Sequence, residues 1–88
     1  MLDFHIIKTL IDQWDPIKLL CCHAPPDEYD YETREILAEV NQLNEISVIE
    51  LSEIIYHTFK ESFGTDVFKY SIDECFDIAE AIISKDSR

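Results

Sequence analysis

Apolar residues recur at helical spacing in two segments of the second half of the chain. In residues 47–64, "SVIELSEIIYHTFKESFG", they are Val48, Leu51, Ile55, Phe59 and Phe63. In residues 71–84, "SIDECFDIAEAIIS", they are Ile72, Cys75, Phe76, Ala79, Ile82 and Ile83. A spacing of three or four residues places side chains on one face of a helix. The pattern therefore predicts two amphipathic helices, each with one buried face.

Both segments open with the two residues of a capping box. Ser47 is followed three positions later by Glu50, and Ser71 is followed in the same way by Glu74. In this motif the serine and glutamate side chains each accept a hydrogen bond from the other residue's backbone N–H. Gly64 follows the first segment, where the end of a helix favours a residue that tolerates positive φ. These signals predict where both helices begin and where the first one ends.

Two further helices are predicted in the first half of the chain. One runs from about Asp3 to Gln13, and its inward residues are Phe4, Ile7, Leu10, Ile11 and Trp14. The other lies in "DYETREILAEVNQL", residues 30–43, with Asp30 as its N-cap. Its buried stripe is Ile36, Leu37, Val40 and Leu43. Because no stretch alternates with the period of a strand, we expect an all-α fold: a compact bundle of about four helices in one domain, residues 1–88.

The connection "WDPIKLLCCHAPPDEYD", residues 14–30, joins the first two helices and is called the elbow here, together with Tyr31. Asp15 before a proline predicts an N-cap with proline at the first helical position, and hence a short extra helical turn after Trp14. The following Ala-Pro-Pro predicts an extended passage. Trp14 and Tyr29 are large enough to pack across the elbow and hold it closed. These features also account for the elbow as a purely structural corner.

The segments "WDPIKLL" and "APPDEYDYE" resemble the signature of the YugE-like family, small bacterial helical proteins of unknown function. Members carry a Trp-Asp-Pro-Ile-x-Leu-Leu segment, then Ala-Pro-x-Asp-Glu-Tyr-Asp, then two amphipathic helices. The resemblance covers nearly the whole chain, including "IIYHTFKESFG". It implies a helical fold and a bacterial origin, with no enzymatic activity attached. The chain departs from the family pattern at Cys21, Cys22 and His23.

The net charge of the chain limits the classes of partner that we expect. Seven Lys and Arg residues stand against nineteen Asp and Glu, which gives a formal net charge of −12. Nucleic acids and anionic membranes are bound through clusters of cations, so we expect neither as a partner. A charge this negative favours capture of a basic protein. The first residues lack the cleavage site of a signal peptide and no apolar run approaches a membrane span, so we expect a cytoplasmic location.

The residues that could carry chemistry do not form a recognisable site. Zinc ligands are normally paired with two to four residues between them, whereas Cys21 and Cys22 are adjacent and His23 follows directly. The acidic run "DEYDYE" lacks the glycine of a calcium-binding loop, and a single glycine in the chain excludes a glycine-rich phosphate loop. Cys75 is expected to be a buried, free thiol. We therefore predict no metal, no cofactor and no catalytic residue.

The sequence favours a non-catalytic, acidic protein-binding module, for instance an immunity-like or antitoxin-like protein. Aromatic anchors ringed by acids suit such a surface, and the elbow supplies them. The candidate partner-binding residues are Trp14, Asp15, Asp27, Glu28, Tyr29, Asp30 and Tyr31. One alternative is a structural subunit of a homodimer, with Ile49 and Ile54 exposed. Another is a small ligand-binding protein or an enzyme that uses carboxylates, although a bundle of 88 residues leaves little room for a pocket.

Replacing both adjacent cysteines tests the absence of a zinc site. Because the ligand spacing is wrong for zinc, Cys21→Ser combined with Cys22→Ser should leave the melting temperature nearly unchanged. Thermal unfolding followed by circular dichroism measures this. Stoichiometric zinc in protein purified without added metal would contradict the prediction.

Overall fold

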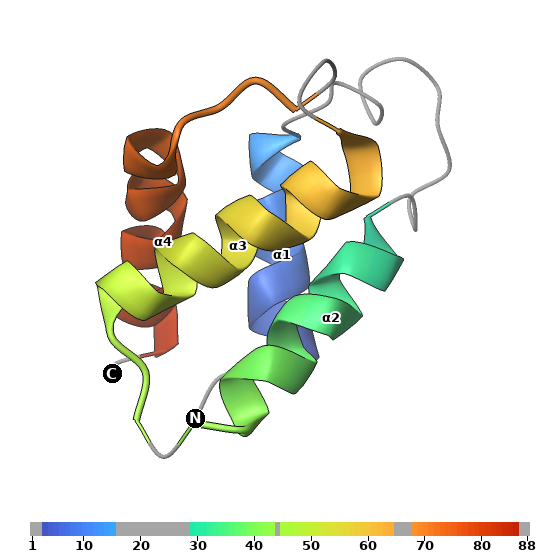
Figure 1. Ribbon diagram of the computed structural model, residues 1–88. Helices are drawn as coiled ribbons and strands as arrows, with labels where there is room; N and C mark the ends of the chain where they lie inside the picture. Colours follow the sequence, from blue (N-terminus) through green and yellow to red (C-terminus); the bar gives the residue numbers. More distant parts are fainter. Residues whose placement is uncertain (1–2, 16–28, 44, 65–67, 87–88) are drawn as a thin grey trace.

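Four helices make up the part of the chain that the computed structural model describes, which is residues 3–15, 29–43, 45–64 and 68–86 (Figure 1). They are α1 (Phe4–Trp14), α2 (Asp30–Asn41), α3 (Val48–Phe63) and α4 (Ile72–Asp86). Within these ranges no residue forms a strand. The predicted all-α fold is confirmed. The predicted extra turn after Trp14 falls outside the described residues.

Capping boxes begin α3 and α4, as predicted. At α3 the backbone N–H of Glu50 donates to Ser47 Oγ at 3.1 Å, and the N–H of Ser47 donates to Glu50 Oε1 at 3.2 Å. At α4 the corresponding distances between Ser71 and Glu74 are 3.3 Å and 3.0 Å. Each satisfied cap stabilises its helix by about 1 kcal/mol, because it pairs backbone donors that have no partner inside the helix. Gly64 ends α3 with φ of +81°, a conformation that favours glycine.

The first two helices are capped less symmetrically. Asp3 precedes α1, and its side chain accepts a hydrogen bond from the backbone N–H of Ile6 at 2.9 Å. The prediction that Asp30 is the N-cap of α2 was wrong, because Asp30 is the first helical residue and Tyr29 occupies the cap position. The carboxylate of Asp30 instead accepts a hydrogen bond from Lys8 of α1 at 2.8 Å. A contact with another helix thus replaces the local capping contact.

In the main helix–helix packing, each helix packs against two others. Both α1 and α3 pack against α2 and against α4. Figure 1 shows α3 crossing obliquely in front of α1, with α2 and α4 on either side. The radius of gyration is 12.1 Å, close to the value of about 12 Å expected for a folded domain of this length.

The core is built from the predicted stripes of all four helices and from two residues outside them. Its fully buried members within the helices are Ile7, Ile11, Ile36, Leu51, Ile55, Phe59, Cys75, Ala79 and Ile82. Tyr29 and Phe68 are also buried, although neither lies in a helix. Burial raises the pKa of the Cys75 thiol to about 12, and Glu74 adds a smaller contribution, so the thiol stays protonated and unreactive at neutral pH.

Three apolar residues assigned to buried stripes are instead exposed. Leu43 and Ile72 are each 38% exposed and Phe76 is 37% exposed. Leu43 lies beyond the last residue of α2, and Ile72 is the first residue of α4, so neither is surrounded by neighbouring helices. Phe76 lies one position beyond the buried Cys75, at the edge of the stripe. Periodicity predicted the direction of the buried faces but not how far they extend.

An aromatic cluster fastens the end of α1 to α3 and to the segment before α4. The ring of Trp14 lies 5.9 Å from Phe59, 6.1 Å from Phe68 and 5.2 Å from Tyr70, centroid to centroid. The Trp14–Phe59 and Trp14–Phe68 pairs meet edge to face, an arrangement that aromatic rings favour. Trp14 therefore joins three parts of the chain that are distant in sequence.

Truncation of Trp14 should destabilise the whole domain. We expect Trp14→Ala to lower the free energy of unfolding by about 3–5 kcal/mol, because it removes a large ring from a packed cluster. Tyr31→Ala is the matched control, since that ring is 63% exposed and should contribute less than about 0.5 kcal/mol. Urea unfolding measures both variants. Equal losses in the two would contradict the role assigned to Trp14.

Candidate functional site

At the elbow, the two ends of the connection are held together by a buried hydrogen bond. The phenol of Tyr29 donates to Asp15 Oδ1 at 2.6 Å, and both residues are buried. Asp15 has φ of +47° and its backbone N–H donates to the carbonyl of Ile11 at 2.8 Å, so it closes α1. The predicted N-cap role of Asp15 was wrong, because an N-cap residue has an extended backbone rather than a left-handed one.

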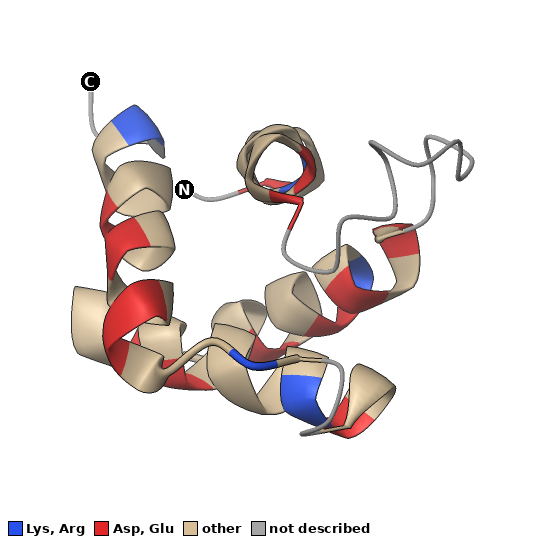
Figure 2. Cartoon of the chain, turned by 90° about the horizontal axis from the view of Figure 1, so that it is seen from above, with Lys and Arg blue, Asp and Glu red and all other residues tan. Residues whose placement is uncertain are grey.

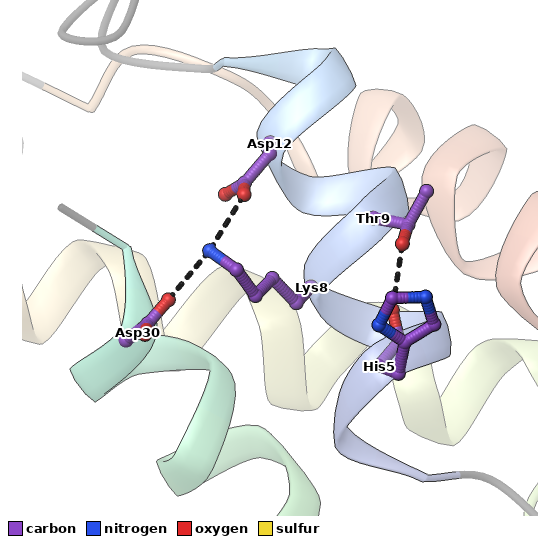
Figure 3. A network of polar contacts seen from close by, with 5 residues as sticks. All are labelled: His5, Lys8, Thr9, Asp12 and Asp30. Atoms are coloured by element: carbon purple, nitrogen blue, oxygen red, sulfur yellow. Dashed lines mark hydrogen bonds and ion pairs between the residues drawn. The ribbon is translucent and has the colours of Figure 1, made fainter. Parts of the chain in front are cut away.

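A lysine on α1 fixes the first turn of α2. Lys8 Nζ lies 2.8 Å from Asp12 Oδ2, one turn further along α1, and 2.8 Å from Asp30 Oδ1 (Figure 3). The pKa of Lys8 is raised above its ordinary value by these hydrogen bonds, of which the one to Asp12 has the larger effect and the one to Asp30 the smaller. The ammonium group therefore stays charged and ties the two helices together. Figure 3 also shows the Thr9 hydroxyl donating to the backbone carbonyl of His5, at 2.8 Å.

Most of the described elbow residues are thus engaged inside the protein. Trp14 packs in the aromatic cluster, Asp15 and Tyr29 bond to each other, and Asp30 contacts Lys8. Among the described candidates, Tyr31 is the one whose side chain is largely exposed. Asp27 and Glu28 lie outside the described residues. The prediction of a partner surface at the elbow therefore rests on Tyr31 and on these two acids.

Tyr31 also lies at the edge of a groove that runs between α2 and α3, called the α2–α3 groove here. Its volume is about 840 Å³, more than was expected for so small a bundle. The α2 side and the residues just after it contribute Tyr31, Glu32, Glu35, Glu39, Gln42 and Leu43. The α3 side contributes Glu50, Glu53, Ile54, His57, Thr58, Glu61 and Ser62.

The lining of the α2–α3 groove is strongly acidic. It holds six glutamates and neither lysine nor arginine. The basic residues on the two helices contact aromatic rings instead: Arg34 lies 5.5 Å from the ring centroid of Phe4, and Lys60 lies 5.3 Å from that of Tyr56. Figure 2 shows how acidic positions outnumber basic ones along the helices. The groove therefore presents a negative potential that a cationic ligand would reduce.

Sequence reasoning missed this groove because it treated the acids of each helix as an ordinary solvated face. The signal was present in their spacing. Glu32, Glu35 and Glu39 recur at intervals of three and four on α2, as do Glu50, Glu53 and His57 on α3, followed by Glu61. Such intervals place each set on one helical face. What the sequence did not reveal is that the two faces lie opposite each other.

Glu32 differs from the other groove glutamates in its burial. It is 6% exposed, and its Oε1 atom has no hydrogen-bond partner among the described residues. Glu35, Glu39, Glu53 and Glu61 are exposed, and Glu50 is committed to its capping box. A buried charged oxygen without a partner is energetically costly. Within the described lining of the groove, Glu32 is therefore the position where pairing with a cationic group would be most favourable.

No group of three or more His, Cys, Asp and Glu residues in the described ranges is arranged to hold a metal ion. The predicted absence of zinc at Cys21, Cys22 and His23 concerns residues outside these ranges and stays a prediction. None of the described helices is long and apolar enough to cross a membrane.

The fold and the groove together define a small all-α protein with an acidic groove between α2 and α3. The chain belongs to the family described as "Domain of unknown function (DUF1871)", whose model matches residues 5–87. Comparisons with curated proteins and with solved structures gave no significant match. The match covers all four helices except the first residue of α1, which is consistent with the extent of the fold.

Removal of the Tyr29 hydroxyl tests the bond that closes the elbow. We expect Tyr29→Phe to lower the free energy of unfolding by about 1.5–3 kcal/mol, because the lost hydrogen bond is buried and its acceptor is a carboxylate. Tyr56→Phe is the matched control, since Tyr56 is only partly buried and no buried hydrogen bond of its hydroxyl is found among the described residues. Chemical denaturation measures both variants. A Tyr29→Phe protein as stable as the control would contradict the assigned role.

Proposed function

We propose that this protein is a non-catalytic binding module that captures a basic partner protein through the α2–α3 groove. One form of this function is neutralisation of a cationic toxin in the bacterial cytoplasm, as an immunity or antitoxin protein does. The observation that carries the proposal is the concentration of six glutamates, without a lysine or arginine, along one groove. The elbow, with Tyr31 at the groove's edge, extends the same surface.

The chemistry of the groove supports protein binding over binding of a small apolar ligand or catalysis. Its volume falls within the range of small-molecule sites, but those sites are mostly lined by apolar and aromatic side chains. Here apolar contributions come from Tyr31, Leu43 and Ile54 at most. Acidic surfaces of this kind speed association with basic partners and exclude acidic ones. The proposal therefore assigns no reaction, cofactor or nucleic-acid ligand.

Neutralising two groove acids should abolish capture of a basic partner. We expect Glu39→Gln with Glu53→Gln to lose proteins that the wild type retains from bacterial lysate, because both exposed carboxylates line the groove. The matched control is Asp77→Asn with Glu80→Gln on α4, which removes two exposed acids outside the groove. Quantitative mass spectrometry of the captured proteins measures the difference.

Two outcomes would contradict assignment of binding to the groove. In the first, the α4 variant loses the same proteins as the groove variant, which would indicate non-specific attraction by net charge. In the second, both variants retain them. Asp27→Lys with Glu28→Lys, carried through the same experiment, separates the elbow from the groove: loss of capture in this variant alone assigns recognition to the elbow.

A homodimer is the second candidate function, and one observation favours it. Ile49, in the first turn of α3, is 62% exposed, as the dimer alternative expected. Ile54 is partly buried and lines the α2–α3 groove, so it does not extend an exposed apolar face from Ile49. The molar mass in solution, measured by light scattering, separates a dimer from a monomeric module.

A further inference from the structure

We propose that Glu32 is the anchor of the α2–α3 groove and receives the guanidinium of a single arginine from the partner protein. The inference rests on the proposed function and adds the chemical group recognised and the residue that recognises it. Exposed groove acids alone would be an ordinary solvated face. Glu32 is different because its carboxylate is buried in the groove lining and Oε1 lacks a partner among the described residues.

The energetics of burial favour a cationic ligand at this position. An unpaired carboxylate removed from water is costly, and the cost is recovered when a donor group pairs with it. The described residues of the groove supply no cation to do this. The nearby Arg34, two residues further along α2, is directed to the ring of Phe4. Among the described residues no donor is therefore left for Glu32 Oε1, and the proposal assigns this role to the partner protein.

Arginine fits this site better than lysine. A guanidinium presents several donors in one plane and pairs with a carboxylate through two parallel hydrogen bonds. It is also more weakly hydrated than an ammonium group, so it enters a buried position at a lower desolvation cost. Glu35 and Glu39 continue from Glu32 along the same face of α2 and would attract flanking basic residues.

The size of the groove suits a short segment of a protein. From Glu50 to Glu61 the α3 wall extends about 16 Å, at 1.5 Å per residue. An extended segment of about five residues spans that distance. The partner is thus expected to insert a short arginine-containing segment between α2 and α3.

The experiment uses three capped peptides of seven residues, in which alanine alternates with arginine, lysine or citrulline. Binding to the full-length protein is followed by amide chemical shifts in NMR titrations. We expect the arginine peptide to shift groove residues of α2 and α3, and Glu32→Gln to weaken it roughly tenfold, the value of one charged hydrogen bond. Citrulline keeps the shape of the arginine side chain without its charge, so the citrulline peptide should bind at least about tenfold more weakly than the arginine peptide. The lysine peptide should bind with intermediate affinity.

Glu35→Gln is the matched control, because it removes an exposed carboxylate from the same face of α2. It should weaken the arginine peptide less than about threefold, as expected for a solvent-screened charge. The melting temperature of Glu32→Gln should not fall, since the change removes the negative charge of a buried carboxylate whose Oε1 lacks a partner among the described residues. A fall of several degrees would assign Glu32 a structural role and overturn the inference.

Three binding outcomes would also overturn it. If Glu32→Gln and Glu35→Gln weakened binding of the arginine peptide equally, Glu32 would not be an anchor. The proposed binding function would be unaffected, because the capture experiment tests it separately. Free arginine that binds as tightly as the peptide would make the groove a small-molecule site. Peptide-induced shifts confined to other surfaces would show that the groove does not receive the guanidinium.

Discussion

Phe59 is the ring on which the rest of the structure depends. Its centroid lies 5.9 Å from Trp14, 5.9 Å from Tyr29 and 5.5 Å from Phe68. These contacts bring the end of α1, the residue before α2 and the segment before α4 onto the C-terminal half of α3. A chain with seven cations against nineteen acids gains little cohesion from ion pairs, so packing of this kind must supply most of it. The positions of the acidic residues are therefore not set mainly by their contribution to stability.

The position of Tyr29 links this core to the α2–α3 groove. Tyr29 packs on Phe59 and Phe63 of α3, while its hydroxyl binds Asp15 at the end of α1. Lys8 adds a second tie from α1 to Asp30, the first residue of α2. The start of α2 is therefore fixed to both neighbouring helices. Glu32 follows within one turn, so its carboxylate is held by a rigid part of the fold, which favours precise recognition.

The sequence predicted local structure well and relations between distant elements poorly. Ser47 with Glu50 and Ser71 with Glu74 act within one helical turn, so their geometry followed directly from spacing. Asp15 and Asp30 were misassigned because their carboxylates bond to Tyr29 and Lys8, which are 14 and 22 positions away in the chain. The groove escaped prediction for the same reason: its two acidic faces are evident separately, but their apposition depends on how α2 packs against α3.

The acidic faces of the α2–α3 groove have an energetic cost in the free protein, and this cost bears on function. Like charges three or four residues apart on a helix destabilise it by about 0.2–0.5 kcal/mol per pair, and both groove walls contain such pairs. Burial of Glu32 adds a larger cost. In a fold whose other capping and packing contacts agree with its sequence, such unfavourable placements of charge tend to occur where a binding or catalytic site requires them. A bound cation would relieve both costs at once, so binding would stabilise a part of the fold that is unfavourable in the free protein.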